Sequence, residues 1–208
     1  MTRTGRPRSF AEDDVVDGAK ELFWRRGYAA TSLRDLKDEL GVLPGSLYVA
    51  FGDKHALFLR ALANYARDMR EAAASMSVDG PVLPRIRELL TGVLEAAGVA
   101  PGRGCMLGNT ATELLPGDEA AGQVVRDAFR ALEQAIEEAL RAAQRSGEVR
   151  ADLDCDAQAR LLVALMQGLH VVARAEPDPQ RLNDVVIAAL AALAHDAPST
   201  ARRTRAPR

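Results

Sequence analysis

The chain has 208 residues and a mass of 22.3 kDa, which is enough for one or two domains with a hydrophobic core. Alanine fills 38 positions while valine, isoleucine and threonine together fill 27, a balance that argues against a mostly β fold and favours an all-α one. The net charge of −2 is unevenly distributed: residues 1–60 carry +1, residues 61–200 carry −7 and residues 201–208 carry +4, so a nucleic-acid contact would be confined to the basic ends.

Three further features indicate a soluble cytoplasmic protein. The longest uninterrupted apolar run, residues 185–194, is about half of the roughly 20 residues that a bilayer requires, so we expect no membrane contact. Residues 2–8 are polar and basic, which argues against a secretory signal peptide. Cys105 and Cys155 are too few for a disulfide framework and fit a reducing compartment.

The first 76 residues contain the start and stop signals of four helices. Ser9 begins an S-x-x-E capping box, and Gly27 and Gly41 each follow a run of apolar residues at helical spacing. Pro44 suits the first turn of a helix, where its missing N–H group costs little. The expected helices cover residues 9–27, 32–41, 45–51 and 54–76.

A polar break at residues 77–84, which contains Gly and Pro, marks the expected domain boundary. Apolar periodicity beyond it predicts five more helices, about nine in the whole chain. These cover residues 82–97, 105–115, 119–145, 156–175 and 179–195. The predicted organisation is an N-terminal domain over residues 1–54 with a connecting helix over 54–76, a second helical domain over 82–196, and a disordered basic tail over 197–208. For the last arginines, a purely solubilising tail without a partner is the simpler explanation.

The last two predicted helices, residues 156–175 and 179–195, are apolar over much of their circumference. A helix that is apolar on more than one face must bury more than one face. Because they stand at the end of a small chain, a second copy of the protein is the simplest cover. We therefore expect a homodimer through these helices.

Residues 32–51 have the form of a helix-turn-helix unit, two short helices joined by a tight turn that contains glycine. The second helix of such a unit enters the major groove of double-stranded DNA while the first braces it. Hydroxyl groups at one helix start suit phosphate, small residues at the next permit close approach, and a phenol and an ammonium follow. The candidate DNA-binding residues from this pattern are Thr31, Ser32, Pro44, Gly45, Ser46, Tyr48 and Lys54. An ordinary helical hairpin with incidental polar residues would show the same spacing.

Residues 9–60 resemble the N-terminal domain of the TetR/AcrR family of bacterial transcription regulators. The matching residues are Ala19, Leu22, Phe23, Gly27, Tyr28, Thr31, Ser32, Gly41, Val42, Gly45, Ser46, Leu47, Tyr48, Phe51, Lys54 and Leu57. The resemblance implies a homodimer on a palindromic operator, with Arg6 and Arg8 of an N-terminal arm assisting. The chain departs from the family at Val49 and Ala50, where histidine is frequent, and at Lys37, where alanine is common. The lack of a polar side chain at 49 and 50 reduces direct base readout there.

By the same resemblance, a small-molecule effector would bind among the middle helices and move the DNA-reading heads. The candidate ligand-binding residues are Met69, Leu90, Val93, Leu94, Cys105, Met106, Asn109, Thr110, Glu113, Phe129, Met166 and His170. Each is also explained as ordinary core, including His170, which stands on an apolar helix. No metal or cofactor is expected, because the three histidines and two cysteines show no metal-ligand spacing.

Cys105 is in addition a candidate reactive thiol. It follows Arg103 at an apparent helix N-terminus, where the helix dipole and the guanidinium would lower the pKa of the thiol. A thiolate there would respond to electrophiles or oxidants. The alternative is a small buried hydrophobic residue without reactivity.

The leading interpretation is a ligand-responsive transcriptional repressor, not an enzyme, that a small molecule releases from its operator. The alternative is a helical ligand-binding protein or enzyme whose N-terminal hairpin is only structural. An enzyme should show a nucleophile with its base, or a metal cluster. No G-x-S-x-G, H-E-x-x-H, phosphate-loop or dinucleotide-binding motif occurs, so the sequence favours the regulator.

Overall fold

The structure, a computed structural model, describes residues 12–74, 76, 80–99 and 102–194. Within these residues it is all-α, as the sequence predicts, with nine helices and no strand. The helices are α1 (Glu12–Arg26), α2 (Leu33–Leu40), α3 (Pro44–Phe51), α4 (Lys54–Ala74), α5 (Val82–Val99), α6 (Met106–Leu114), α7 (Glu119–Ser146), α8 (Cys155–Ala175) and α9 (Pro179–Leu193). The predicted capping box at Ser9, the arm residues Arg6 and Arg8, and the tail 197–208 lie outside the described residues.

Local signals set the ends of α2 and α3. The Ser32 hydroxyl accepts a hydrogen bond from the Asp35 N–H group, and the Asp35 carboxylate accepts one from the Ser32 N–H group. This reciprocal cap satisfies donors that the first turn of a helix leaves unpaired. Gly41 ends α2 with a φ of 65°, a left-handed conformation that glycine adopts without strain, and Pro44 opens α3. The tight turn between the two helices is therefore specified by residues within it.

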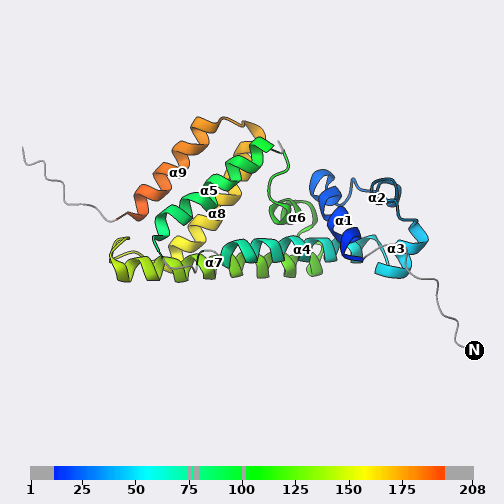
Figure 1. The fold of residues 1–208 in the computed structure, drawn as a ribbon, viewed down its shortest axis with the longest axis horizontal. Helices are drawn as coiled ribbons and strands as arrows, with labels where there is room; N and C mark the ends of the chain where they lie inside the picture. Colours follow the sequence, from blue (N-terminus) through cyan, green and yellow to red (C-terminus); the bar gives the residue numbers. More distant parts are fainter. Residues whose placement is uncertain (1–11, 75, 77–79, 100–101, 195–208) are drawn as a thin grey trace, which may run out of the picture.

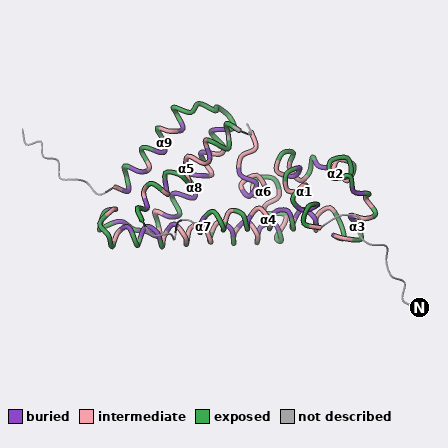
Figure 2. Tube along the Cα trace, viewed as in Figure 1, coloured by how far each residue is buried: buried purple, intermediate pink, exposed green. Residues whose placement is uncertain are grey.

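The molecule is elongated, with a head (α1–α3) at one end and a body (α5–α9) that extends to the other (Figure 1). α4 runs from the head along the body and packs side by side with α7. α6 is the part of the body that lies nearest the head (Figure 1). Buried residues follow the inner faces of these helices, while the outer faces are exposed (Figure 2).

Two clusters of buried side chains stabilise this arrangement. One joins α1–α4 to the start of α6, through Met106 and Leu107, and to the first half of α7, through Val125. The other joins α5, α8 and α9 to the second half of α7. Because α6 contributes to the core of the head, the head is packed directly on the body and is not connected through α4 alone.

No helix in the described part of the chain is both long enough and apolar enough to cross a membrane. Over the same residues, no three His, Cys, Asp or Glu side chains come together as a group that could hold a metal ion.

Candidate nucleic-acid interface and ligand pocket

The outward surface of α2 and α3 forms the candidate nucleic-acid interface. Leu36, Leu47 and Phe51 are buried in the core of the head and hold the two helices in place. Five of the predicted DNA-binding residues keep exposed or half-buried positions on these helices or at their starts: Ser32, Pro44, Gly45, Ser46 and Tyr48. Their backbone positions follow from the locally specified turn.

Two other predicted residues, Thr31 and Lys54, make contacts inside the head. Thr31 is fully buried, and its hydroxyl donates to the Gly27 carbonyl at 2.7 Å. The Lys54 ammonium donates to the carbonyl oxygens of Tyr28 at 2.9 Å and Thr31 at 2.8 Å. The same ammonium lies 4.1 Å from the centre of the Tyr28 ring, a cation–π contact. Both residues therefore hold the start of α4 against the turn that precedes α2.

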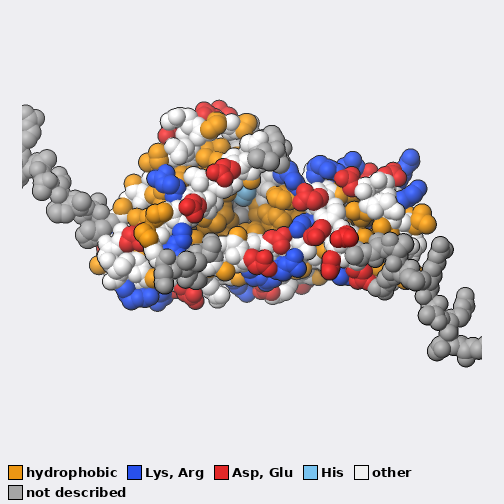
Figure 3. Space-filling view, viewed as in Figure 1, with side chains coloured by type: hydrophobic (Ala, Val, Ile, Leu, Met, Phe, Trp, Pro, Cys, Tyr) orange, Lys and Arg blue, Asp and Glu red, His pale blue; other side chains and the backbone are white. Residues whose placement is uncertain are grey.

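Arg34 and Lys37 add positive charge to α2 that the sequence interpretation did not include. The Arg34 side chain is 89% exposed, and Lys37 is exposed as well. Because they are three residues apart, they share one side of the helix. At the end of the molecule that carries α2, Lys and Arg side chains are interspersed with Asp and Glu (Figure 3), and Arg34 itself lies 3.7 Å from the Asp38 carboxylate. The sequence already shows two basic residues three positions apart in the first helix of the predicted helix-turn-helix unit. That spacing could have identified Arg34 and Lys37 as candidate DNA contacts.

The candidate ligand pocket is a cavity of about 430 Å³ between α6, α7 and α8. Two facing rows form it, because residues three, four or seven apart share one face of a helix. The row at α6 consists of Cys105, Gly108, Asn109 and Thr112, and the row on α8 consists of Gln167, His170 and Arg174. The lining is completed by Gly104, Ala111, Phe129 and Val171. Four of the predicted ligand-binding residues are among these: Cys105, Asn109, Phe129 and His170.

The polar chemistry of the pocket is that of hydrogen-bond donors and neutral groups. The amide Nε2 of Gln167 is buried without a hydrogen-bond partner. Burial lowers the pKa of His170 below its usual 6.5, which keeps the imidazole neutral at pH 7. Arg174 contributes a guanidinium, and neither Asp nor Glu is among the described lining residues. An occupant that carries a hydrogen-bond acceptor would therefore satisfy the Gln167 donor, which is unpaired in the free protein.

The structure places the other predicted ligand-binding residues outside this cavity. Buried in the cores are Leu90, Val93, Met106, Thr110 and Met166, and Met69 packs against both clusters. Leu94 lines a separate hollow of about 60 Å³. Apolar spacing marks a buried helix face but does not distinguish a filled core from a cavity. The lining residues that the sequence interpretation missed are Gly104, Gly108, Ala111, Thr112, Gln167, Val171 and Arg174; the spacing of Gln167 and Arg174 from His170 was the available signal.

Residues 102–105 connect the pocket to the head. The indole Nε1 of Trp24 in α1 donates to the Gly104 carbonyl at 2.9 Å, and the Arg103 guanidinium lies 3.9 Å from the centre of the Trp24 ring. From the pocket side, Asn109 Nδ2 donates to the Arg103 carbonyl at 2.7 Å and Arg174 Nε donates to the Gly102 carbonyl at 2.6 Å. The same short segment is thus held by two pocket residues and by the head.

Glu113, a predicted ligand-binding residue, forms a second connection to the head. Its carboxylate accepts hydrogen bonds from the N–H groups of Tyr28 at 3.0 Å and Ala29 at 2.7 Å. A third connection, made through the first turn of α4 beside the head, joins His55 to Asp118, the cap of α7, at 2.6 Å. Hydrogen bonding from the Ala121 N–H group and from His55 holds the pKa of Asp118 below its usual range. All three connections lie at the end of the body that faces the head.

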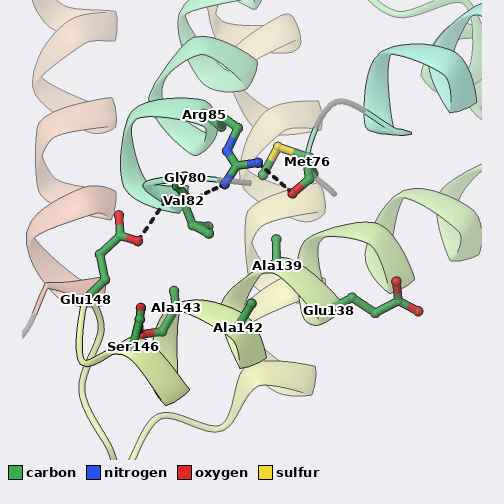
Figure 4. Close-up of a pocket in the computed structure, with 10 residues that line it drawn as sticks. All are labelled: Met76, Gly80, Val82, Arg85, Glu138, Ala139, Ala142, Ala143, Ser146 and Glu148. Atoms are coloured by element: carbon green, nitrogen blue, oxygen red, sulfur yellow. Dashed lines mark hydrogen bonds between the residues drawn. The ribbon is translucent and has the colours of Figure 1, made fainter. Parts of the chain in front are cut away.

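A second cavity, of about 370 Å³, lies where the α4–α5 turn meets the end of α7 (Figure 4). Arg85 donates to the carbonyls of Met76 and Gly80, and the Glu148 carboxylate accepts from the N–H groups of Val82 and Leu83. A carboxylate at the N-terminus of α5 is favoured by the helix dipole. These hydrogen bonds hold the turn between α4 and α5 in place. The polar groups of this cavity therefore have a structural role.

Cys105 is the N-cap of α6 and is 2% exposed. The Tyr65 hydroxyl lies 3.8 Å from its Sγ atom, and burial raises the pKa of that phenol. The neighbouring Arg103 guanidinium is engaged with Trp24 and pairs with Glu21 at 2.5 Å. The thiol therefore belongs both to the core of the head and to the wall of the pocket.

Comparison with known proteins identifies the family. The family model described as bacterial regulatory proteins, tetR family, matches residues 15–61, and the model for a tetracyclin repressor-like C-terminal domain matches residues 82–189. The chain belongs to the TetR family of transcriptional regulators. The resemblance found in residues 9–60 is thereby confirmed, and the family match extends through α5 to α9.

Relatives in the family align over nearly the whole chain. The uncharacterized HTH-type transcriptional regulator YezE of Bacillus subtilis (strain 168) is 32% identical over 91% of this chain and 99% of its own length. The HTH-type transcriptional repressor ComR of Escherichia coli (strain K12) is 26% identical over 87% of this chain and 88% of its own. Among solved structures, a cysteine mutant of the TetR family regulator CifR in complex with 26 bp double-strand operator DNA is 30% identical, with a TM-score of 0.76, and covers 91% of this chain and 100% of that one.

Proposed function

We propose that the chain is a homodimeric repressor that binds a palindromic operator and is released from it by a small-molecule effector. The observation that carries this proposal is the double role of residues 102–105, which form part of the pocket wall and bond to α1 of the head. An occupant of the pocket can therefore displace the head without touching DNA. The name of ComR as a repressor and the operator complex of CifR support the same function.

The outward faces of α8 and α9 support dimerisation through these helices. Leu161, Val172 and Ile187 are large apolar side chains that stay exposed on the single chain. Gly168 of α8 is exposed, and a Cβ atom added there would meet nothing within 4 Å, which leaves room for a helix of a second copy. Burial of such a face in a partner subunit removes apolar surface from water, which is favourable in proportion to its area.

The proposed mechanism is a change in the separation of the two heads. Two heads of a symmetric dimer must meet successive major grooves about 34–36 Å apart, so a displacement of a few ångströms breaks the register. An effector shifts this equilibrium only by its differential affinity for the two separations, and a coupling of about 1–3 kcal/mol lowers operator affinity roughly 5–150-fold. By reciprocity, operator DNA weakens effector binding by the same factor.

The pocket favours an effector with an acceptor or anionic group and an apolar portion. The donors of Gln167 and Arg174 lie on the α8 side, and Phe129 supplies an aromatic surface from α7. The volume of about 430 Å³ falls within the range of small-molecule sites. Competition of such a group for Arg174 would loosen its bond to the Gly102 carbonyl and so release residues 102–105.

For DNA contact we assign the reading surface and its basic neighbours: Ser32, Arg34, Lys37, Pro44, Gly45, Ser46 and Tyr48, with Arg6 and Arg8 from the arm. Thr31 and Lys54 support this surface from behind. The proposed functional division is a head over residues 1–54, a connecting helix over 54–76, an effector and dimer domain over 82–196 and a tail over 197–208. The chain would act by binding alone, without enzymatic activity, in the cytoplasm where its operator lies.

The experiment is a titration of fluorescent duplexes, taken from the DNA that flanks the gene, over a series of salt concentrations. We expect sequence-selective binding that weakens steeply with salt, and Arg34→Ala or Lys37→Ala should each reduce the slope by about 0.9. Arg130→Ala on α7, exposed and outside the assigned surface, is the matched control and should leave the slope unchanged. Absence of selective binding to any duplex would overturn the proposed function, whereas identical slopes for all variants would overturn only the assigned surface.

A further inference from the structure

The outward side of α3 carries no charged or amide side chain for reading guanine, adenine or cytosine, and its polar side chains are the hydroxyls of Ser46 and Tyr48. Leu47 and Phe51 point into the core of the head, which leaves Gly45, Tyr48 and Val49 exposed along the helix. Arg and Lys bind guanine edges, Asn and Gln bind adenine edges, and Asp and Glu accept from cytosine. None of these six residue types occurs between Leu43 and Phe51. The side chains of α3 therefore offer no charged or amide group for direct readout of those bases.

What α3 offers to DNA is apolar surface. Val49 is 80% exposed and Leu43, the N-cap, is 65% exposed, although aliphatic side chains of this size are ordinarily buried. The major groove contains one apolar group, the 5-methyl group of thymine. An exposed valine and leucine on a helix that enters the groove match that group and no other base feature.

Gly45 provides an independent indication that α3 approaches another molecule closely. A Cβ atom at this position would meet nothing within 4 Å, and the φ angle is not in the left-handed region, so the fold itself does not require glycine. By contrast, Gly41 and Gly52 at the ends of α2 and α3 have φ angles of 65° and 90°, where glycine is required. Glycine inside a helix costs conformational entropy without benefit to the isolated chain. The space it leaves at the start of α3 fits the DNA, which approaches the N-terminal turn of a recognition helix.

We infer that α3 recognises operator DNA through thymine methyl groups, contacted by Val49 and Leu43, with Gly45 leaving room for the duplex. This inference rests on the proposed function. Residues 43 and 49 are separated by about 9 Å along the helix axis, at a rise of about 1.5 Å per residue. Because the two side chains lie that far apart, each half-site should present two readable thymines in different base pairs.

The experiment replaces thymine by deoxyuridine, which removes the 5-methyl group and leaves every hydrogen-bonding atom in place. The operator is first selected from a random duplex library with the full-length protein. Each thymine of one half-site is then exchanged singly, and the dissociation constant is measured by fluorescence anisotropy. We expect about a fourfold loss of affinity at two positions, the ratio that corresponds to burial of one methyl group.

Two variants assign each methyl group to its side chain. Val49→Ala should abolish the discrimination of thymine from deoxyuridine at one of these positions and retain it at the other, and Leu43→Ala should do the reverse. Both side chains are largely exposed, so neither substitution removes core packing. Lys37→Ala is the control, since loss of a phosphate contact should weaken binding to thymine and deoxyuridine duplexes alike.

The outcomes separate this inference from the function on which it rests. Tight, selective operator binding with equal affinity for thymine and deoxyuridine at every position would overturn the inference and leave the repressor function in place. Selected operators that lack thymine in the half-site core would overturn it as well. A library selection that yields no preferred duplex would overturn both, and would leave the apolar side of α3 as a contact for another protein.

Discussion

Replacement of Trp24 by phenylalanine tests the contact between the head and residues 102–105. The indole Nε1 donates to the Gly104 carbonyl at 2.9 Å, the Arg103 guanidinium lies 3.9 Å from the ring centre, and the Tyr65 ring packs edge-on at 5.0 Å. Phenylalanine retains an aromatic ring but removes the N–H donor and presents a smaller face to the cation. The change therefore weakens this one connection while it keeps an aromatic ring between head and body.

The expected loss of stability follows from the two interactions. The hydrogen bond to Gly104 contributes about 1 kcal/mol net, a typical value for a partly buried bond between neutral groups. The weaker attraction to Arg103, whose side chain is 24% exposed, accounts for about 0.5 kcal/mol. A total of about 1.5 kcal/mol corresponds to a decrease in Tm of about 3–6 °C for a chain of this length at fixed protein concentration.

Thermal unfolding followed by far-ultraviolet circular dichroism measures this decrease. Tyr48→Phe is the matched control, because it also removes a polar aromatic group, but from an exposed side chain that makes no hydrogen bond to the described residues. Its Tm should change by less than about 1 °C. A Trp24→Phe variant with the Tm of the wild type would refute the assignment of residues 102–105 as an energetically significant connection. An equal decrease in the control would show that the loss is not specific to this contact.

Three further changes test other parts of the mechanism. Gly45→Ala should raise the free energy of unfolding by about 0.5 kcal/mol, because alanine favours the helix and the added Cβ meets no atom of the chain. The same change should weaken operator binding. Unaltered operator affinity would contradict a close approach of DNA to α3. Alkylation with a thiol reagent should release operator from the wild type and from a Cys155→Ser control, but not from Cys105→Ser, since Cys105 lines the pocket. Equal release from all three proteins would show that Cys105 is only a packing residue. Acidification from about pH 7.5 to about pH 5.5 should destabilise the wild type more than His170→Gln in urea titrations. Burial lowers the pKa of His170, so the unfolded chain gains a proton at higher pH than the folded one, and stability present above about pH 6.5 is lost as the pH falls toward the lowered pKa. Parallel pH profiles for the two proteins would show that His170 titrates alike in the folded and unfolded states.

The helices and the helix-turn-helix unit were predictable because the residues that determine them are local in the sequence. A helix begins where a side chain accepts hydrogen bonds from its first N–H groups, or where proline, which has no N–H group, occupies the first turn. It ends where glycine can turn the backbone. These residues lie at the ends of the segment itself, so they can be found in the sequence. The ends of α4 to α9 accordingly lie within two residues of the predicted ones. The turn from Gly41 to Pro44 could be predicted for the same reason, and so could the resemblance to the TetR family.

Side-chain direction across the molecule was not predictable in this way. Thr31 and Lys54 stand at positions that suit phosphate, yet Thr31 is buried and Lys54 bonds to carbonyls of the preceding turn. Glu113 has the polarity of a ligand-binding residue but accepts hydrogen bonds from the head. In each case the partner lies on another element or turn, and only packing decides which one is within hydrogen-bond distance.

The pocket depends entirely on tertiary structure. Its two rows, near Asn109 on α6 and near His170 on α8, are far apart in the chain and face each other because both helices pack on α7. Periodicity in the sequence reveals that each helix has an inward face, but residues on that face either fill the core, as Leu90 does, or border a cavity, as Gln167 does. Which of these occurs depends on how closely neighbouring helices approach, and that distance is set by side-chain volumes from several helices at once.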